Sequence, residues 1–132
     1  MSRRLDGPDA MPAYIAVIAD VVGSRGLDPD SRSLLQEELQ EFLLTVNEGY
    51  ADSIAAAFVI TTGDEFQGLL KDASMVPDLL WAAKTQVKRT GIRFGIGYGT
   101  LHTALLAEAV GMDGPAFHNA REAIVVAKKE GW

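Results

Sequence analysis

Two short stretches decide the fold: Tyr14-Ile15-Ala16-Val17-Ile18-Ala19-Asp20 and Thr61-Thr62-Gly63-Asp64-Glu65-Phe66-Gln67. The first is a continuous apolar run that ends in a carboxylate, which is typical of a strand buried on both faces. The second places a Gly-Asp turn between two apolar runs and predicts a hairpin. Both stretches bring an acid to the end of a strand, so the order of the strands decides whether the two acids meet.

The rest of the chain predicts two helices between strands and one more helix after them. Asp28 and Pro29 open the first helix, because an aspartate can cap a helix and a proline suits its first turn. Apolar residues then recur at helical spacing in two stripes. The predicted strands are 14–19, 55–61, 65–70, 93–99 and 101–106, and the predicted helices are 29–46, 76–87 and 115 to near 129. Apart from the short run 101–106, this β-α-β-β-α-β order with an extra C-terminal helix predicts an α+β, ferredoxin-like sandwich, in which an antiparallel sheet carries helices on one face.

Length and composition predict one globular domain. The chain has 132 residues, of which 48% are apolar, enough for a single core. Residues 1–12 are polar and contain Gly7, Pro8 and Pro12, so we expect a flexible N-terminal tail at 1–12 and a domain at 13–132.

The charge balance excludes several classes of function. The net charge of −6 argues against direct nucleic-acid binding by this domain, because proteins that neutralise a phosphate backbone are usually basic. The chain has no cysteine and two histidines, so carboxylates are the expected metal ligands, and they favour Mg²⁺, Mn²⁺ or Ca²⁺ over zinc. No apolar run approaches the roughly 20 residues that span a bilayer, and no signal peptide is evident. We therefore expect a cytoplasmic protein without membrane contact.

Asp20 and Asp64 are the candidate metal ligands. In the predicted topology the first strand is central and lies beside the strand that leads into the hairpin, so the two acids can lie close together. Two nearby carboxylates repel each other unless a cation lies between them or one takes up a proton. Alternatively, Asp64 is an ordinary turn residue and Asp20 caps the following loop. For the pair in this topology, we favour a metal.

The loop after Asp20 is a candidate phosphate site. Small residues at Val22 and Gly23 would leave backbone N–H groups open to phosphate oxygens. Ser24 could donate a hydrogen bond and Arg25 could pair with a phosphate, and Gly63 of the hairpin completes the predicted set. The alternative is an ordinary strand-to-helix loop with a solvated arginine.

Polar residues also gather at the start of the last helix. Asp113, His118, Asn119 and Arg121 surround its N-terminus, where such a cluster can bind an anion or contact a base. The alternative is a capped helix with a polar face, in which His118 is a surface histidine.

Three glycines, Gly95, Gly97 and Gly99, alternate along one predicted strand. The spacing is wrong for a dinucleotide-binding fingerprint, and no helix begins directly after it. Glycines on one strand face more often allow a helix or a ligand to approach closely.

These motifs resemble those of nucleotidyl cyclases. The run 20–24 resembles the first metal-binding stretch of class III nucleotide cyclases, where an aspartate ends strand one and a small-residue loop holds the triphosphate. The run 62–66 resembles both the cyclase hairpin that carries the second metal aspartate and the GGDEF hairpin of diguanylate cyclases. More closely, the chain resembles the SatD family of bacterial proteins, through the runs 18–25, 63–68, 93–97 and 114–121 taken in order.

The resemblance implies a metal-dependent, nucleoside triphosphate-binding domain. It implies Mg²⁺ or Mn²⁺ at Asp20 and Asp64, ATP or GTP as the ligand, and a homodimer, since related cyclases build their site across two chains. His118, Asn119 and Arg121 are then the candidate catalytic residues.

The chain also departs from the cyclase pattern. His118 and Glu122 stand where these cyclases have an asparagine and an arginine on the last helix, and Ile60 stands where they have a base-reading lysine. Thr62 replaces the first glycine of GGDEF. Three interpretations stay open: a cyclase-type domain that binds and converts the nucleotide, a non-catalytic regulatory or protein-interaction module of the SatD family, or a purely structural assembly domain whose acids are only turn residues.

Overall fold

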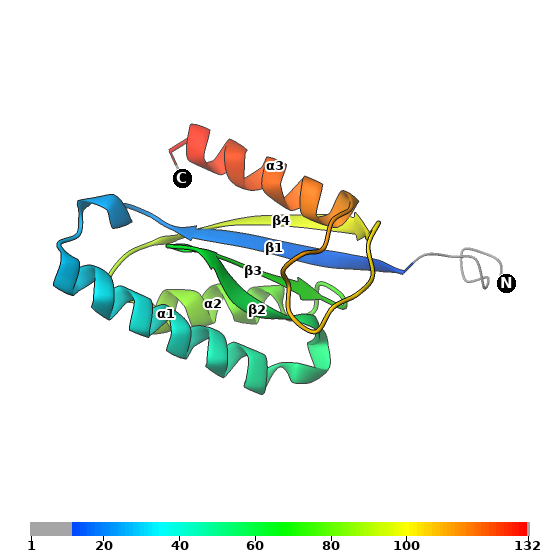
Figure 1. The fold of residues 1–132 in the computed structure, drawn as a ribbon, viewed down its shortest axis with the longest axis horizontal. Coiled ribbons are helices and arrows are strands. Elements are labelled where there is room, and N and C mark those ends of the chain that lie inside the picture. Colours follow the sequence, from blue (N-terminus) through cyan, green and yellow to red (C-terminus); the bar gives the residue numbers. More distant parts are fainter. Residues whose placement is uncertain (1–11, 132) are drawn as a thin grey trace, which may run out of the picture.

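The computed structural model describes residues 12–131 and has the predicted βαββαβ order followed by a further helix (Figure 1). The elements are β1 (Ala13–Val21), α1 (Pro29–Gly49), β2 (Ile54–Thr62), β3 (Glu65–Leu70), α2 (Val76–Gln86), β4 (Ile92–Thr100) and α3 (Pro115–Lys129), with short 3-10 turns η1 (Ser24–Gly26) and η2 (Ala51–Ser53). Except for Pro12, the predicted N-terminal tail lies outside the described residues.

The four strands form one sheet in the order β2-β3-β1-β4, in which every neighbouring pair is antiparallel. The predicted ferredoxin-like sandwich is therefore confirmed, with β1 in a central position. In the register, Asp20 at the end of β1 lies opposite Glu65 of β3 on one side and Arg93 of β4 on the other. Three charged residues thus lie in one row across the sheet.

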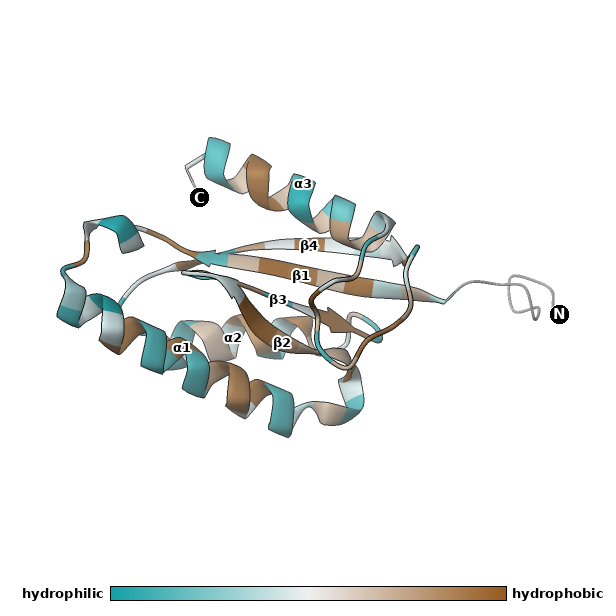
Figure 2. Cartoon of the chain, viewed as in Figure 1, coloured by the Kyte–Doolittle hydropathy of each residue, from teal (hydrophilic) through white to brown (hydrophobic). Residues whose placement is uncertain are grey.

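The sheet is covered on both faces. The helices α1 and α2 pack on one face and α3 packs on the other (Figure 1). Alternate residues of β1 serve the two cores: Val17 joins the core beneath α1 and α2, and Ile18 joins the core beneath α3. Figure 2 shows the apolar colour running along β1 and alternating with hydrophilic bands on α1, as expected for a central strand and an amphipathic surface helix.

The predicted start of α1 is also confirmed. The carboxylate of Asp28 accepts a hydrogen bond of 2.7 Å from the backbone N–H of Ser31, and Pro29 occupies the first turn. Because this bond favours the ionised carboxylate, the pKa of Asp28 lies below its ordinary value. The cap fixes where α1 begins, directly after the loop that follows β1.

The glycines of β4 allow α3 to approach the sheet at backbone distance. A Cβ atom added to Gly97 would lie 2.2 Å from the backbone nitrogen of Ala120, and one added to Gly95 would lie 2.3 Å from the Ala120 carbonyl oxygen. These distances are shorter than any real Cβ contact. The close approach suggested by the glycine pattern is therefore made by a helix.

The prediction of a strand at 101–106 is wrong. These residues form an irregular loop in which Leu101 is buried and residues 102–106 are exposed. The backbone pairs with the sheet only further along the chain, where Ala57 donates to the Ala107 carbonyl at 2.8 Å and Ala109 donates to the Ala57 carbonyl at 2.9 Å. The apolar residues that suggested a strand are thus divided between the core and the surface of a covering loop.

Candidate functional site

The end of β1 and the β2–β3 hairpin meet, as predicted. The neighbour of β1 is however β3, which leads out of the hairpin, and the prediction that β1 lies beside the strand leading into it is wrong. The backbone N–H of Val21 donates to the Asp64 carbonyl at 3.2 Å, and Asp20 lies opposite Glu65 in the register. The two predicted acids are therefore close in the backbone. Their side chains, however, have different partners.

Asp20 is held by two cations. Its side chain is 9% exposed, and Arg93 of β4 donates from Nε to Oδ1 at 3.2 Å and from Nη2 to Oδ2 at 3.4 Å. The ammonium of Lys128, in the last turn of α3, lies 3.0 Å from Oδ2. These charge-assisted contacts compensate the cost of burying the carboxylate.

The neighbouring acid on the same face, Glu65, is paired with Arg121 of α3. The two side chains form a bidentate pair, with distances of 2.8 and 3.0 Å. Hydrogen bonding to Glu65 raises the pKa of Arg121 further above its already high ordinary value. Asp20 and Glu65 thus tie two turns of α3 to the sheet.

Asp64 points to a different environment, beside the loop η1 and the first turns of α1. The hydroxyl of Ser24 donates to the Asp64 carboxylate. A small cavity of about 180 Å³ opens next to this contact. Its lining consists of Ser24, Arg25, Arg32, Leu35, Gln36, Gly63 and Asp64.

Three of the five predicted phosphate-site residues therefore converge at this cavity, namely Ser24, Arg25 and Gly63, whereas Val22 and Gly23 do not line it. Gly23 adopts a left-handed backbone with φ of 76°, which turns the chain from β1 into η1.

Two polar residues of this cavity, Arg32 and Gln36, were not among the predicted site residues. Arg32 donates from Nη2 to the Ser24 carbonyl at 3.4 Å, and the Gln36 amide donates to the Gly63 carbonyl. The two are four residues apart on α1, so they lie on one helix face directly after the cap. This i, i+4 spacing of polar residues behind a helix start is the signal that could have found them.

The candidate catalytic residues of α3 do not converge on the cavity. His118 lies 2.7 Å from Asp113, and the Asn119 amide donates to the Tyr98 carbonyl at 2.9 Å. Backbone hydrogen bonding from Gly114, followed by the nearby His118 and His102, holds the pKa of Asp113 below its ordinary value. Of the predicted set, only Arg121 lies near the acidic strand ends, and Glu65 binds it.

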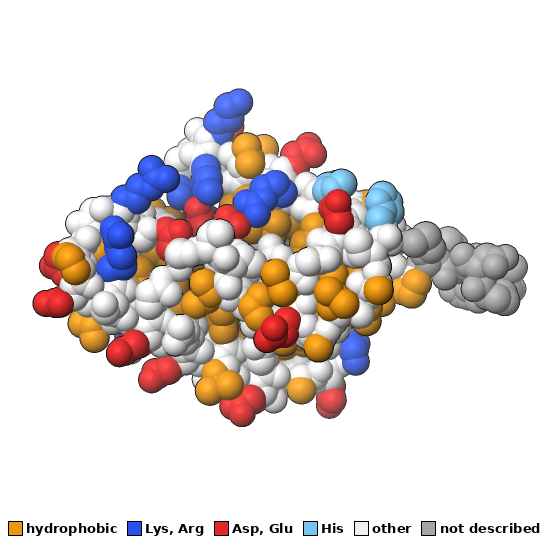
Figure 3. Space-filling view, in the orientation of Figure 1, with side chains coloured by type: hydrophobic (Ala, Val, Ile, Leu, Met, Phe, Trp, Pro, Cys, Tyr) orange, Lys and Arg blue, Asp and Glu red, His pale blue; other side chains and the backbone are white. Residues whose placement is uncertain are grey.

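Basic side chains collect around this end of the sheet, although the chain carries a net charge of −6. Figure 3 shows Lys and Arg side chains grouped over the end where α1 begins, with acidic side chains among them. The cations whose contacts place them here are Arg25, Arg32, Arg93, Arg121 and Lys128. Within residues 12–131, no acid forms an ion pair with Arg25 or Arg32. Their charge is available to an anion.

The carboxylates of Asp20 and Asp64 suit a hard cation, provided that Lys128 is displaced from Asp20. Mg²⁺ is usually held by one or two carboxylates together with substrate phosphates, and Asp20 and Asp64 supply two carboxylates on adjoining backbone segments. Across the described residues, no group of three or more His, Asp or Glu is arranged to hold a metal ion. A metal that binds Asp20 must first displace Lys128, whose ammonium already places positive charge beside this carboxylate.

Comparisons with solved structures show the fold. The guanylate cyclase domain of RhGC from Catenaria anguillulae, solved in complex with GTP, is 13% identical and superimposes with a TM-score of 0.60, over 86% of this chain and 72% of that one. A diguanylate cyclase/phosphodiesterase from Caldicellulosiruptor saccharolyticus is 17% identical, with a TM-score of 0.50, over 96% of this chain and 75% of that one. The architecture is thus cyclase-like.

The family is shown by sequence. No curated protein matches the chain. Within the described part of the chain, no helix has the length and apolar character needed to cross a membrane. The model of the SatD family matches residues 14–130, nearly the whole described chain, and the protein therefore belongs to the SatD family.

Proposed function

We propose that this domain binds a nucleoside triphosphate, ATP or GTP, together with Mg²⁺ or Mn²⁺, at the end of the sheet where β1 meets the hairpin. The observation that carries the proposal is the cavity beside Asp64, where Ser24, Arg25 and Arg32 come together with the hairpin. Cyclase-like architecture supports it, and one structural neighbour was solved with GTP.

The phosphates would be held by charge and by hydroxyl donation. Arg25 and Arg32 are the guanidinium groups of the cavity, and neither is neutralised by an acid of the described chain. Guanidinium groups suit phosphate because they donate in a fixed, bidentate geometry. Ser24 would exchange its bond to Asp64 for a phosphate oxygen.

Asp64 and Asp20 would hold the metal, which requires the two side chains to turn toward each other, because Asp64 now lies beside α1 and Asp20 faces α3. When bound, the metal would neutralise phosphate charge and polarise the phosphoryl oxygens. Asp20 becomes available to it once Lys128 leaves Oδ2 and the longer Arg93 Nη2 contact to the same oxygen opens. The ammonium is then free to face the phosphates, so the positive charge at the site is retained.

Binding without turnover is the form of this function that the geometry supports best. His118, Asn119 and Arg121 each have a partner within the protein, and the first two lie near the start of α3, whereas Lys128 lies in its last turn. The second candidate function is a non-catalytic regulatory module that passes the nucleotide state to a partner. The internal contacts of these three side chains favour it as well. A cyclase reaction would require these side chains to leave their present contacts.

A homodimer completes the proposal. Leu105, Leu106 and Val110 are each 43–50% exposed on the loop that covers the sheet beside α3. Exposed apolar residues that gather on one loop favour a protein interface. Sedimentation equilibrium of the wild type and of Leu105→Ser would measure the dimer and its dependence on this loop.

Calorimetry with ATP and GTP, each with and without Mn²⁺ or Mg²⁺, tests nucleotide binding. We expect metal-dependent binding that is reduced at least tenfold by Asp64→Asn, which keeps the side-chain shape and removes its charge, and also by Arg32→Met. The matched control is Arg89→Met, because Arg89 is a partly exposed arginine outside the cavity. Chromatography of the products then separates an enzyme from a sensor.

Two results would contradict the proposal. The absence of binding of any nucleotide with either metal would remove both forms of it. Equal affinity in wild type and Arg32→Met would show that the nucleotide binds somewhere other than this cavity.

A further inference from the structure

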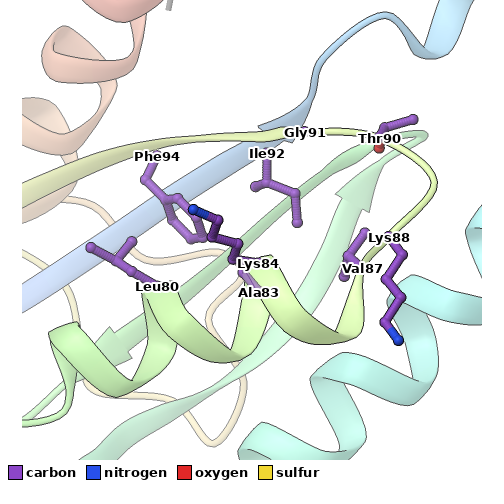
Figure 4. A pocket seen from close by; sticks show the side chains of 9 residues that line it. All are labelled: Leu80, Ala83, Lys84, Val87, Lys88, Thr90, Gly91, Ile92 and Phe94. Atoms are coloured by element: carbon purple, nitrogen blue, oxygen red, sulfur yellow. The ribbon is translucent and has the colours of Figure 1, made fainter.

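A second cavity, larger than the first, opens between α2 and β4. Its volume is about 540 Å³, within the range of small-molecule sites. The side chains around it are Leu80, Ala83, Lys84, Val87, Lys88, Thr90, Gly91, Ile92 and Phe94 (Figure 4). It shares no lining residue with the cavity beside Asp64, so the two cavities are separate candidate sites.

The wall of this second cavity is mainly apolar. Ala83 of α2 and Val87, the residue directly after α2, are each only 3% exposed, and Ile92 and Phe94 come from β4, an edge strand of the sheet. Figure 4 shows the Phe94 ring and the Leu80 side chain on the same side of the cavity. An apolar, flat molecule would cover surface that is otherwise left to water.

Two polar groups of the lining lack partners. The Thr90 hydroxyl oxygen is buried and has no hydrogen-bond partner in the described chain. Lys84 extends from α2 toward Phe94 (Figure 4), and among residues 12–131 no acid pairs with it. Figure 4 shows Lys88 pointing away from the cavity. One ammonium and one hydroxyl therefore remain to orient a ligand.

We propose that this second cavity binds an aromatic carboxylate. The ring would pack against Phe94, Val87 and Ala83. The single carboxylate would pair with the Lys84 ammonium. It would also accept a hydrogen bond from the Thr90 hydroxyl once that side chain turns from its buried position into the cavity, which relieves the cost of an unpartnered buried group. One ammonium matches one negative charge, which favours a monocarboxylate over a polyphosphate.

The probe is 2-naphthoate, titrated into the full chain and followed by amide NMR shifts and by calorimetry. We expect shifts centred on Thr90, Gly91 and Phe94. Lys84→Met, which keeps the apolar stem, should weaken binding about tenfold, and Thr90→Val, which keeps the shape, about threefold. Lys71→Met is the matched control, because Lys71 is an exposed lysine outside the lining, and it should leave the affinity unchanged.

Two further ligands test the chemistry. The neutral 2-naphthalenemethanol should bind about tenfold more weakly than 2-naphthoate, and octanoate should bind more weakly than 2-naphthoate. Equal affinity for the neutral analogue, or unchanged affinity in Lys84→Met, would overturn the recognition of the carboxylate. Tighter binding of octanoate would overturn the aromatic class.

A filling variant tests the location. Ala83→Leu should abolish binding while circular dichroism shows an intact fold, and retained binding would overturn the assignment to this cavity. If Ala83→Leu does not fold, Thr90→Val decides in its place, because this substitution removes one oxygen without adding bulk. Shifts that cluster away from the lining in the wild type would also overturn the proposal.

Discussion

Asp64 and Glu65 are adjacent in the chain, yet they face different environments. Glu65 faces α3 and is held by a bidentate arginine, and Asp20 on the same face is held by two cations. Asp64 lies beside α1, where it accepts from one hydroxyl and borders a cavity with two arginines that no acid of the described chain neutralises. The α3 side uses its charges for internal contacts, whereas the α1 side leaves positive charge available to a ligand.

Substitutions on the α3 side and on the α1 side should change different measured quantities. Substitutions on the α3 side should change the free energy of unfolding, because their partners belong to the protein. Substitutions beside Asp64 should mainly change ligand affinity, because the expected partner is not part of the chain. Lys128 stands between the two cases, since it holds Asp20 now and would release it to a metal.

The largest loss of stability is expected from a substitution where α3 contacts β4. Gly97→Ala places a carbon 2.2 Å from the Ala120 nitrogen, so α3 must shift as a unit and the loss of stability should be about 3 kcal/mol. Urea denaturation measures it. Gly49→Ala is the control, because nothing lies within 4 Å of the added carbon, and this change at the end of α1 should be neutral or slightly stabilising. A loss below about 0.5 kcal/mol in Gly97→Ala would mean that the contact is not tight.

The next effect is the loss of the ion pair beside the glycine contact. Arg121→Met leaves Glu65, whose side chain is 16% exposed, without its bidentate partner. We expect a loss of about 1 to 2 kcal/mol in the free energy of unfolding. Arg89→Met is the matched change, because the Arg89–Glu38 pair is longer, at 3.9 Å, and its acid is more exposed, at 25%. It should cost about 0 to 0.5 kcal/mol. Equal losses in the two variants would remove the distinction.

Lys128→Met tests whether Lys128 and the metal compete for Asp20, and the quantity measured is ligand affinity. The variant releases one cation from Asp20, and we expect Mn²⁺–nucleotide affinity to rise about fivefold, or about 1 kcal/mol. Lys129→Met, a neighbouring lysine of the same turn, should leave the affinity unchanged. If Lys128→Met weakens binding instead, Lys128 contributes more through the phosphates than it hinders the metal.

The smallest expected effect is on the free energy of unfolding at acidic pH. The pKa of Asp113 is lower in the folded protein than its ordinary value, first because Gly114 donates a backbone hydrogen bond to it. The resulting stability is present above the ordinary pKa of the carboxyl and is lost as the pH falls through the folded pKa. Asp113→Asn should therefore flatten the decline in the free energy of unfolding below about pH 4, measured by urea denaturation at several pH values. An unchanged slope would contradict this role of Asp113.

The fold was predictable because its signals are local. The apolar run of β1, the Gly-Asp turn and the capping aspartate of α1 each determine backbone geometry within a few residues. The strand order then brought Asp20 and Asp64 together in the backbone, as expected. The prediction failed at 101–106, where an apolar loop covers the sheet without pairing as a strand.

The side-chain partners were not predictable in the same way. Lys128 meets Asp20 across more than a hundred positions, and this contact depends on the height and rotation of α3 above β4. Arg32 and Gln36 reach the cavity only because the cap starts α1 at the correct residue. The sequence therefore indicated which acids matter, but it did not indicate that Asp20 is neutralised by Arg93 and Lys128.

The backbone contact between α3 and the glycines of β4 also has a kinetic consequence. Because β4 contributes no side chain where α3 crosses its glycines, the helix cannot tilt without clashing with the strand, and it should leave the sheet as one unit or remain attached. Amide hydrogens beneath it would then exchange together, in a single opening event. The same event would uncover Asp20 and Glu65 at once, so the rate at which this helix opens would set how often both carboxylates meet solvent.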